Sequence, residues 1–253
     1  MTSRDNASRI RDDLIAAFGL LSRLPLPALD IAPAPRAAWA WPVVGAALGA
    51  LCALTASLAL SLSLPAGVAA ALALTASALL TGGLHEDGLA DSADGLFGGS
   101  SRERRLEIMK DSRIGSYGVL ALLLVTLMRW SALTALILSD QHWAGLIAAG
   151  ALSRAPMAVL IAALPNARGS GLSQMTGLPP RGAILAALII AATFGFLCTG
   201  LALFPMALAA ALTTALLART ASRRISGQTG DILGASQQLA EAAALSLLAA
   251  HFA

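Results

Sequence analysis

Residues 40–62 read AWPVVGAALGALCALTASLALSL and contain no charged side chain. An apolar stretch of about 17 to 25 residues is long enough to cross a bilayer as a helix. The whole chain is 57% hydrophobic and only 12% charged, with a mean hydropathy of +0.75. It therefore has too little polar surface to coat a water-soluble globule. We predict an all-α, polytopic integral membrane helix bundle.

About seven stretches of this kind divide the chain, with an amphipathic helix from Arg9 to Leu24 lying in the membrane interface before them. The run from Ala183 to Ala218 is long enough for two spans and is divided by a turn between Gly200 and Pro205. We treat residues 1–253 as one membrane domain. The predicted spans are 40–62, 67–83, 117–139, 143–164, 183–200, 201–218 and 235–252.

The basic residues predict which loops face the cytoplasm. If the N-terminus is cytoplasmic, the inner segments are 1–39, 84–116, 165–182 and 219–234. They hold fifteen of the seventeen Lys and Arg residues, and the other two, Arg129 and Arg154, lie inside spans. This distribution obeys the positive-inside rule. Because these residues are scattered without interleaved aromatic side chains, we exclude a nucleic-acid partner.

The segment at residues 82–99, GGLHEDGLADSADGLFGG, is the strongest candidate for a site in the cytoplasmic loop 84–116. Asp87, Asp91 and Asp94 are spaced so that a helix would place all three on one face. Carboxylates so close together repel one another unless a cation lies among them, and carboxylate oxygens suit Mg²⁺. The alternatives are a solvated acidic loop and, for the adjacent His85, a packing or hydrogen-bonding role.

Three further groups are candidates for binding a phosphate-bearing ligand. The first is Lys110, Asp111 and Arg113, for which the alternative is a purely topological role. The second is Arg154, which must face the bundle interior and either contacts substrate or pairs with Glu241. The third is the loop 219–234, where the segment around Thr229 and Asp231 is either a helix N-terminus capped by Asp231 or a second contact for metal and phosphate.

Five strings resemble the cobalamin synthase family, the adenosylcobinamide-GDP ribazoletransferases, in the right order from about Phe18 to Glu241. They are FGLLSRLPLP, AWAWPVVGAALGA, the acidic segment above, RRLEIMKDSRIGSYG and GQTGDILGA. Glu86 departs from the family pattern, in which we expect an apolar residue. The family motif positions fall on His85, Asp87, Gly88, Asp91, Asp94, Gly95, Lys110, Asp111, Ser112, Arg113, Gly227, Thr229, Gly230 and Asp231.

The resemblance implies a Mg²⁺-dependent enzyme of the bacterial inner membrane, with its site facing the cytoplasm. In this family α-ribazole or its 5′-phosphate displaces GMP from adenosylcobinamide-GDP. The resemblance leaves room for a homo-oligomer, or for a complex with other cobalamin-assembly enzymes. The rival hypotheses are another Mg²⁺-dependent intramembrane transferase acting on diphosphates, and a corrinoid permease.

We assign a separate role to each group of these residues. Asp87, Asp91 and Asp94 hold Mg²⁺ against the diphosphate, and His85 or one of the carboxylates removes a proton from the attacking hydroxyl. The glycines Gly88 and Gly95 let the backbone approach a bulky ligand. The remaining phosphate oxygens are bound by Lys110, Arg113 and Arg154.

Overall fold

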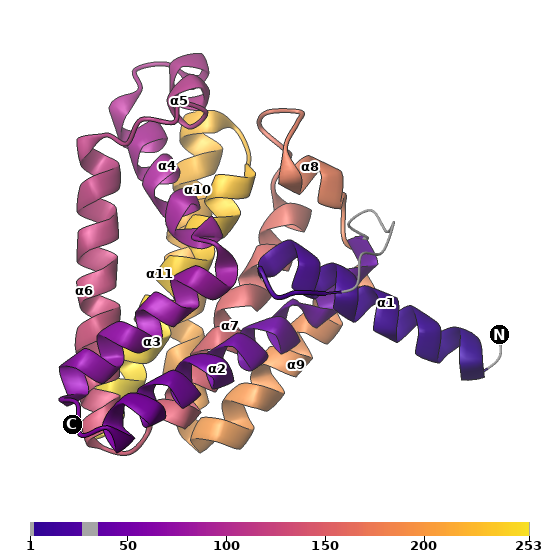
Figure 1. Ribbon diagram of the computed structural model, residues 1–253. Coiled ribbons are helices and arrows are strands. Elements are labelled where there is room, and N and C mark those ends of the chain that lie inside the picture. Colours follow the sequence, from indigo (N-terminus) through magenta and orange to yellow (C-terminus); the bar gives the residue numbers. More distant parts are fainter. Residues whose placement is uncertain (1–2, 27–34, 253) are drawn as a thin grey trace.

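The computed structural model describes residues 3–26 and 35–252, and these residues form helices with no strand among them (Figure 1). The all-α prediction is confirmed. Residues 27–34 of the predicted interfacial N-terminal segment lie outside the described residues. The elements are α1 (Ser3–Leu21), η1 (Pro35–Ala40), α2 (Trp41–Ser61), α3 (Ala66–Thr81), α4 (Leu84–Gly98), α5 (Arg102–Ile108), α6 (Ser116–Leu138), α7 (His142–Ala163), α8 (Leu172–Thr176), α9 (Arg181–Thr199), η2 (Gly200–Ala202), α10 (Leu203–Ile225) and α11 (Gly230–Phe252).

Several of these helices are long and apolar enough to cross a membrane. Within the described residues, five helical segments meet the requirements of length and composition, or six if the bent pair α3 and α4 is one span. This number is lower than the predicted seven because residues 181–225 count as one 45-residue segment and because α3 alone has 16 residues. Dividing that segment into α9 and α10 and counting the bent pair as one span gives the predicted seven.

The 45-residue segment is nevertheless interrupted at the predicted place. Gly200 has a φ of +58°, and η2 separates α9 from α10 there. One straight helix of that length would measure roughly 67 Å at 1.5 Å per residue, more than twice the roughly 30 Å hydrocarbon core of a bilayer. Leu178, just before α9, and Gln228, just after α10, line one cavity. The two helices therefore run antiparallel, as Figure 1 also shows.

The predicted loop 84–116 is largely helical, which corrects the sequence interpretation. Gly82 and Gly83 both have positive φ, 66° and 69°, and the chain bends by 89° between α3 and α4. Glycine adopts this conformation without the steric cost that a Cβ would bring. The acidic segment thus forms the 15-residue helix α4, which contacts α6 and α11. The second predicted loop, 219–234, shrinks to residues 226–229 between α10 and α11.

Small residues let α2 and α7 approach closely in the centre of the bundle. A Cβ on Gly45 would collide with the carbonyl oxygen of Gly150, and one on Gly49 would collide with that of Leu146. Close backbone approach through small residues is the usual basis of helix association in membranes. Leu133, Leu136 and many alanines fill the surrounding core.

The N-terminal helix α1 packs against this core by its C-terminal half, while its N-terminal end projects away from the bundle (Figure 1). Ala17 and Leu21 are buried in the same cluster as Trp41. The carboxylate of Asp13 accepts hydrogen bonds from Arg36 Nε at 2.7 Å and from Trp39 Nε1 at 3.0 Å. These contacts fix α1 beside the start of α2.

A buried charge network joins α4, α6 and α11. The Arg129 guanidinium is 3% exposed in α6 and pairs with Glu241 of α11. It also donates to Gln238 Oε1 at 2.7 Å and lies 3.5 Å from Glu86 Oε1 of α4. Gln238 Nε2 donates to Glu86 at 3.0 Å. Glu86, where the motif resemblance leads us to expect an apolar residue, is thus partly buried and belongs to this network.

Substituting Arg129→Leu leaves Glu241 buried without its partner. We expect the free energy of unfolding in mixed micelles to fall by about 3 to 5 kcal/mol, the usual cost of breaking a buried pair. The double variant Arg129→Leu/Glu241→Leu should recover part of this loss. Arg104→Leu, which removes an exposed pair with Glu107, is the control and should change little. Equal effects of the two single substitutions would contradict the assignment.

Candidate functional site

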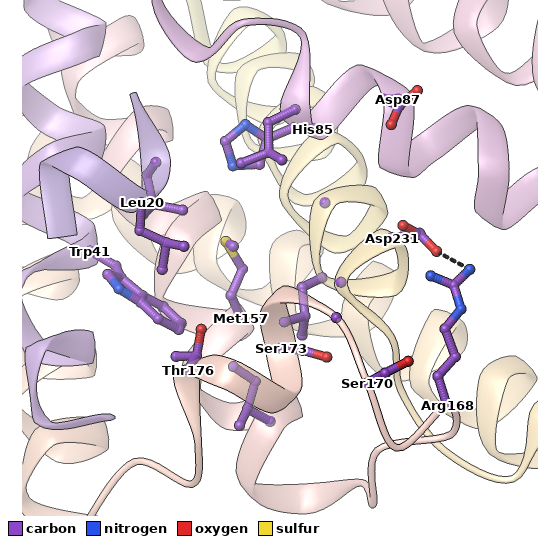
Figure 2. Close-up of a pocket in the computed structure, with 17 residues that line it drawn as sticks. Leu20, Trp41, His85, Asp87, Met157, Arg168, Ser170, Ser173, Thr176 and Asp231 are labelled. Atoms are coloured by element: carbon purple, nitrogen blue, oxygen red, sulfur yellow. Dashed lines mark ion pairs between the residues drawn. The ribbon is translucent and has the colours of Figure 1, made fainter. Parts of the chain in front are cut away.

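A cavity of about 230 Å³ opens where α4 and α11 begin and α7 ends. Figure 2 shows Asp87 and His85 on one side of it and Asp231 and Arg168 on another, with Trp41 and Met157 among the apolar lining. Residues from two of the sequence motifs therefore meet here. Ser170, Ser173 and Thr176, from the segment that contains α8, add hydroxyl groups.

The close crossing of α4 and α11 brings the two motifs together. A Cβ on Gly88 would lie 2.9 Å from the carbonyl oxygen of Asp231, and one on Gly234 would lie 3.3 Å from the Cα of His85. Any larger residue at Gly88 would push the helices apart. The glycine predicted to admit a ligand therefore admits the backbone of α11, which places Asp231 opposite Asp87.

Asp231 is held by two donors at the start of α11. Arg168 Nη2 lies 2.6 Å from Asp231 Oδ2, and Thr229 Oγ1 donates to the same oxygen at 3.2 Å. Thr229 Oγ1 in turn accepts from the Ile232 amide at 3.3 Å, so Thr229 caps the helix while it orients Asp231. The predicted cap is therefore present, but Thr229 supplies it in place of Asp231, which lines the cavity.

Arg168, predicted from the sequence only as one of the basic residues of an inner loop, lines the cavity. Its Nε is buried and has no hydrogen-bond partner among the described residues. A donor left in this state is suited to an anion. The neighbouring backbone is anchored by Arg102, which donates to Ala167 O at 2.8 Å and to Ile225 O at 3.1 Å. No feature of the sequence distinguishes an arginine that lines a cavity from one that only marks the cytoplasmic side of a span.

His85 lies in the first turn of α4 and is only 1% exposed. Its ring lines the cavity, and its Nε2 has no hydrogen-bond partner among the described residues (Figure 2). Burial of an unpaired ring nitrogen is costly. The nitrogen is therefore available to a group that enters the cavity, which agrees with the predicted role in proton transfer.

The three aspartates have different surroundings. Asp87 is exposed and lines the cavity, and Asp91, half-buried one turn later, lies in electrostatic range of Asp87, Asp231, Arg168 and Asp94. Asp94 instead accepts hydrogen bonds from the Gly115 amide at 2.6 Å and the Gly118 amide at 2.9 Å. Among the residues that the structure describes, no three acidic, His or Cys side chains form a metal-binding group.

Gly95 and residues 110–113 lie outside the cavity lining. A Cβ on Gly95 would collide with the Met109 side chain, so this glycine serves the packing of α5 on α4. Lys110, Ser112 and Arg113 are exposed in the segment between α5 and α6. Arg113 Nη2 lies 2.6 Å from Asp111 Oδ2, and this interaction lowers the pKa of Asp111 to about 2. The structure does not bring this predicted phosphate-binding group to the cavity.

Arg154 also lies outside the cavity. It is 3% exposed in α7, and its Nη1 donates to Gly150 O at 3.0 Å. No ion pair between Arg154 and Glu241 is found within the described part of the chain, because Glu241 pairs with Arg129. Arg154 shares a small pocket with Arg129, Glu241 and Cys52, so its role belongs to the buried network.

Comparison with known proteins identifies the family of the chain. The family model described as cobalamin-5-phosphate synthase matches residues 13–249. The chain belongs to the cobalamin-5-phosphate synthase family. The relatives of this family include the adenosylcobinamide-GDP ribazoletransferase of Bradyrhizobium diazoefficiens, 47% identical over 95% of this chain and 94% of that protein.

Two further relatives with the same name show similar coverage. The protein from Azorhizobium caulinodans is 47% identical over 94% of this chain and 95% of its own length, and that from Mesorhizobium japonicum is 43% identical over 94% and 92%. No solved structure matches the chain significantly. The resemblance to the cobalamin-5-phosphate synthase family seen in the motifs is therefore confirmed over nearly the whole chain.

The capping geometry of Asp94 leads to a prediction that separates it from Asp87 and Asp91. Asp94→Ala removes the acceptor for two amides at the start of α6, so the free energy of unfolding should fall by about 0.5 to 2 kcal/mol. The affinity of the folded variant for Mg²⁺, measured by calorimetry, should stay at the wild-type value. Normal stability combined with lost Mg²⁺ affinity would restore Asp94 as a metal ligand.

Proposed function

We propose that this chain transfers the cobinamide-phosphate moiety of adenosylcobinamide-GDP to α-ribazole or its 5′-phosphate and releases GMP. The observation that carries the proposal is the single cavity that joins Asp87 and His85 of one motif to Asp231 of another, with Arg168 beside them. The family match supports the same reaction. A site of this composition suits a diphosphate, which needs both metal-binding oxygens and cationic donors.

The carboxylates fit Mg²⁺ in the way this ion is usually bound. Mg²⁺ commonly takes one or two protein carboxylates and completes its shell with water and substrate phosphate oxygens. Asp87 and Asp91, spaced four residues apart on α4, would hold it, and Asp231 lies within electrostatic range of both. When bound, the ion would neutralise charge on the diphosphate and on the departing phosphate.

The protein groups supply the remaining steps. Arg168 Nε, which has no hydrogen-bond partner in the part of the chain that the structure describes, binds a phosphate oxygen, while Arg168 Nη2 stays in its ion pair with Asp231. The 3′-hydroxyl oxygen of α-ribazole forms a bond to the cobinamide-proximal phosphorus, and the bond from that phosphorus to the GMP oxygen breaks. His85 Nε2 takes the hydroxyl proton. GMP leaves with the bonding electron pair.

The position in the cell follows from the distribution of charge. The bundle and the arginine-rich inner loops support a multi-pass protein of the bacterial inner membrane, with the cavity at its cytoplasmic side. The homo-oligomer and the complex with other cobalamin-assembly enzymes stay predictions. A corrinoid permease would require its polar residues to line a path through the bundle. Three of the charged side chains inside this bundle, Arg129, Glu86 and Glu241, are instead paired with one another.

An Asp87→Asn variant tests the reaction directly. GMP release from adenosylcobinamide-GDP and α-ribazole should fall at least about 100-fold, since even outer-shell partners of a metal change affinity or activity by roughly 10 to 100-fold. Purified protein in micelles is assayed over a range of Mg²⁺ concentrations.

Glu107→Gln, an exposed carboxylate of α5, is the control and should retain full activity. Unchanged Mg²⁺-dependent turnover in folded Asp87→Asn protein would rule out the proposed role of Asp87. Wild-type protein that moves corrinoid across vesicles without releasing GMP would favour the permease.

A further inference from the structure

A second cavity of about 460 Å³ adjoins the first and shares Ile161 and Ser173 with it. Its lining comes from the end of α7, from α8 and the residues that follow it, and from Gln228 in the α10–α11 connection. Among the described residues that line it, none carries a charge. The two cavities therefore differ in chemistry, one acidic and basic, the other polar and neutral.

The backbone amide and the backbone carbonyl of Gln228 are both hydrogen-bonded. The Gln228 amide donates to Pro165 O at 2.8 Å, and the Gln228 carbonyl accepts from the Ala167 amide at 2.8 Å. A Cβ on Gly227 would collide with Pro165 O, so the glycine permits this pairing. The position of the Gln228 side chain is thereby fixed relative to both cavities.

The side-chain oxygen of Gln228, by contrast, has no partner in the described part of the chain. The residue is 2% exposed, and its Oε1 has no hydrogen-bond partner among the described residues. A buried amide oxygen in this state costs about 1 to 3 kcal/mol. It lines the neutral cavity, so a ligand with an N–H donor would remove that cost.

Asn166, which lies beside Gln228 in the backbone pairing, is already satisfied. Asn166 Oδ1 accepts from the amides of Arg168 and Gly169 at 2.9 and 2.7 Å, and Asn166 Nδ2 donates to Ser173 Oγ at 2.7 Å. These bonds hold the loop that carries Arg168. Among the described residues that line this cavity, Gln228 is thus the one with a buried side-chain atom that has no hydrogen-bond partner.

We propose that the neutral cavity binds the guanine base of the nucleoside diphosphate substrate, with Gln228 Oε1 accepting from the N1–H and N2–H groups of the base. The inference rests on the proposed function and adds a subsite to it. Guanine carries two such donors on one edge, whereas the benzimidazole of α-ribazole has no N–H once its nitrogen bears the ribose. The diphosphate then reaches Arg168 and Asp87 in the adjoining cavity.

Binding of GMP to the full chain in micelles, measured by equilibrium dialysis, tests the subsite. Wild-type protein should bind GMP at least about 10-fold more tightly than AMP or ribose 5-phosphate, because one buried hydrogen bond to an otherwise unpaired group has this effect. Gln228→Leu should lose that preference. Gln228→Glu, which keeps the acceptor oxygens, should retain most of it. Gln141→Leu, at the opposite end of α7, is the matched control.

Each result has one meaning. Equal wild-type affinities for GMP, AMP and ribose 5-phosphate would overturn the proposed guanine subsite. This test uses wild-type protein alone, so it does not depend on whether the Gln228→Leu variant folds. A folded Gln228→Leu protein that still prefers GMP would also overturn it. Absence of GMP release from adenosylcobinamide-GDP by wild-type protein, with guanine preference intact, would overturn the proposed reaction and leave the subsite standing.

Discussion

A guanidinium buried in an apolar bundle has to be neutralised, and Arg129 satisfies this requirement with partners from two other helices. Glu241 and Gln238 join it to α11, and Glu86 joins it to α4. Glu86 is flanked in sequence by His85 and Asp87. The pairing therefore sets the depth at which α4 begins, and with it the position of the two side chains that line the cavity.

The close approach of α4 and α11 at two glycines, together with the charge network, positions the residues of the cavity. Because Gly88 and Gly234 let α4 and α11 touch, Asp87 and Asp231 face one space although they lie far apart in the chain. Arg168 reaches that space from the loop after α7, and Arg102 holds the loop to the end of α10. The helices α4 and α11 and the loop after α7 thus supply the charged residues of one cavity, and contacts outside the cavity position each of them.

Much of the fold was predictable because hydrophobic length and turn residues are local properties. The apolar runs, the division at Gly200 and the importance of the acidic and Gly-Gln-Thr-Gly motifs all follow from neighbouring residues. The helical spacing of the aspartates was also correct, since α4 is a helix. Spacing alone does not reveal which partner a carboxylate meets, so Asp94 was grouped with Asp87 and Asp91 although it caps α6.

Other parts of the site depend on contacts between distant segments. Arg168 and Gln228 owe their positions to the backbone pairing of residues 165–167 with residue 228, which no periodicity reports. The exposed group at 110–113 carries the charges expected of a phosphate site, but charge does not fix location. Arg154 could be placed in the interior by its burial cost, and Glu241 could be named as a neighbour, since both line one small pocket, although Glu241 forms its ion pair with Arg129.

The position of Glu86 also bears on exchanging parts between relatives. Suppose that the acidic helix of this chain were transplanted into a relative with an apolar residue at that position. The added carboxylate would then need a neighbouring arginine whose N–H groups are not already hydrogen-bonded. The reverse exchange would remove one of two negative charges around Arg129. A chimaera of this family should therefore carry α4, α6 and α11 together, because these three helices form one electrostatic unit inside the bilayer.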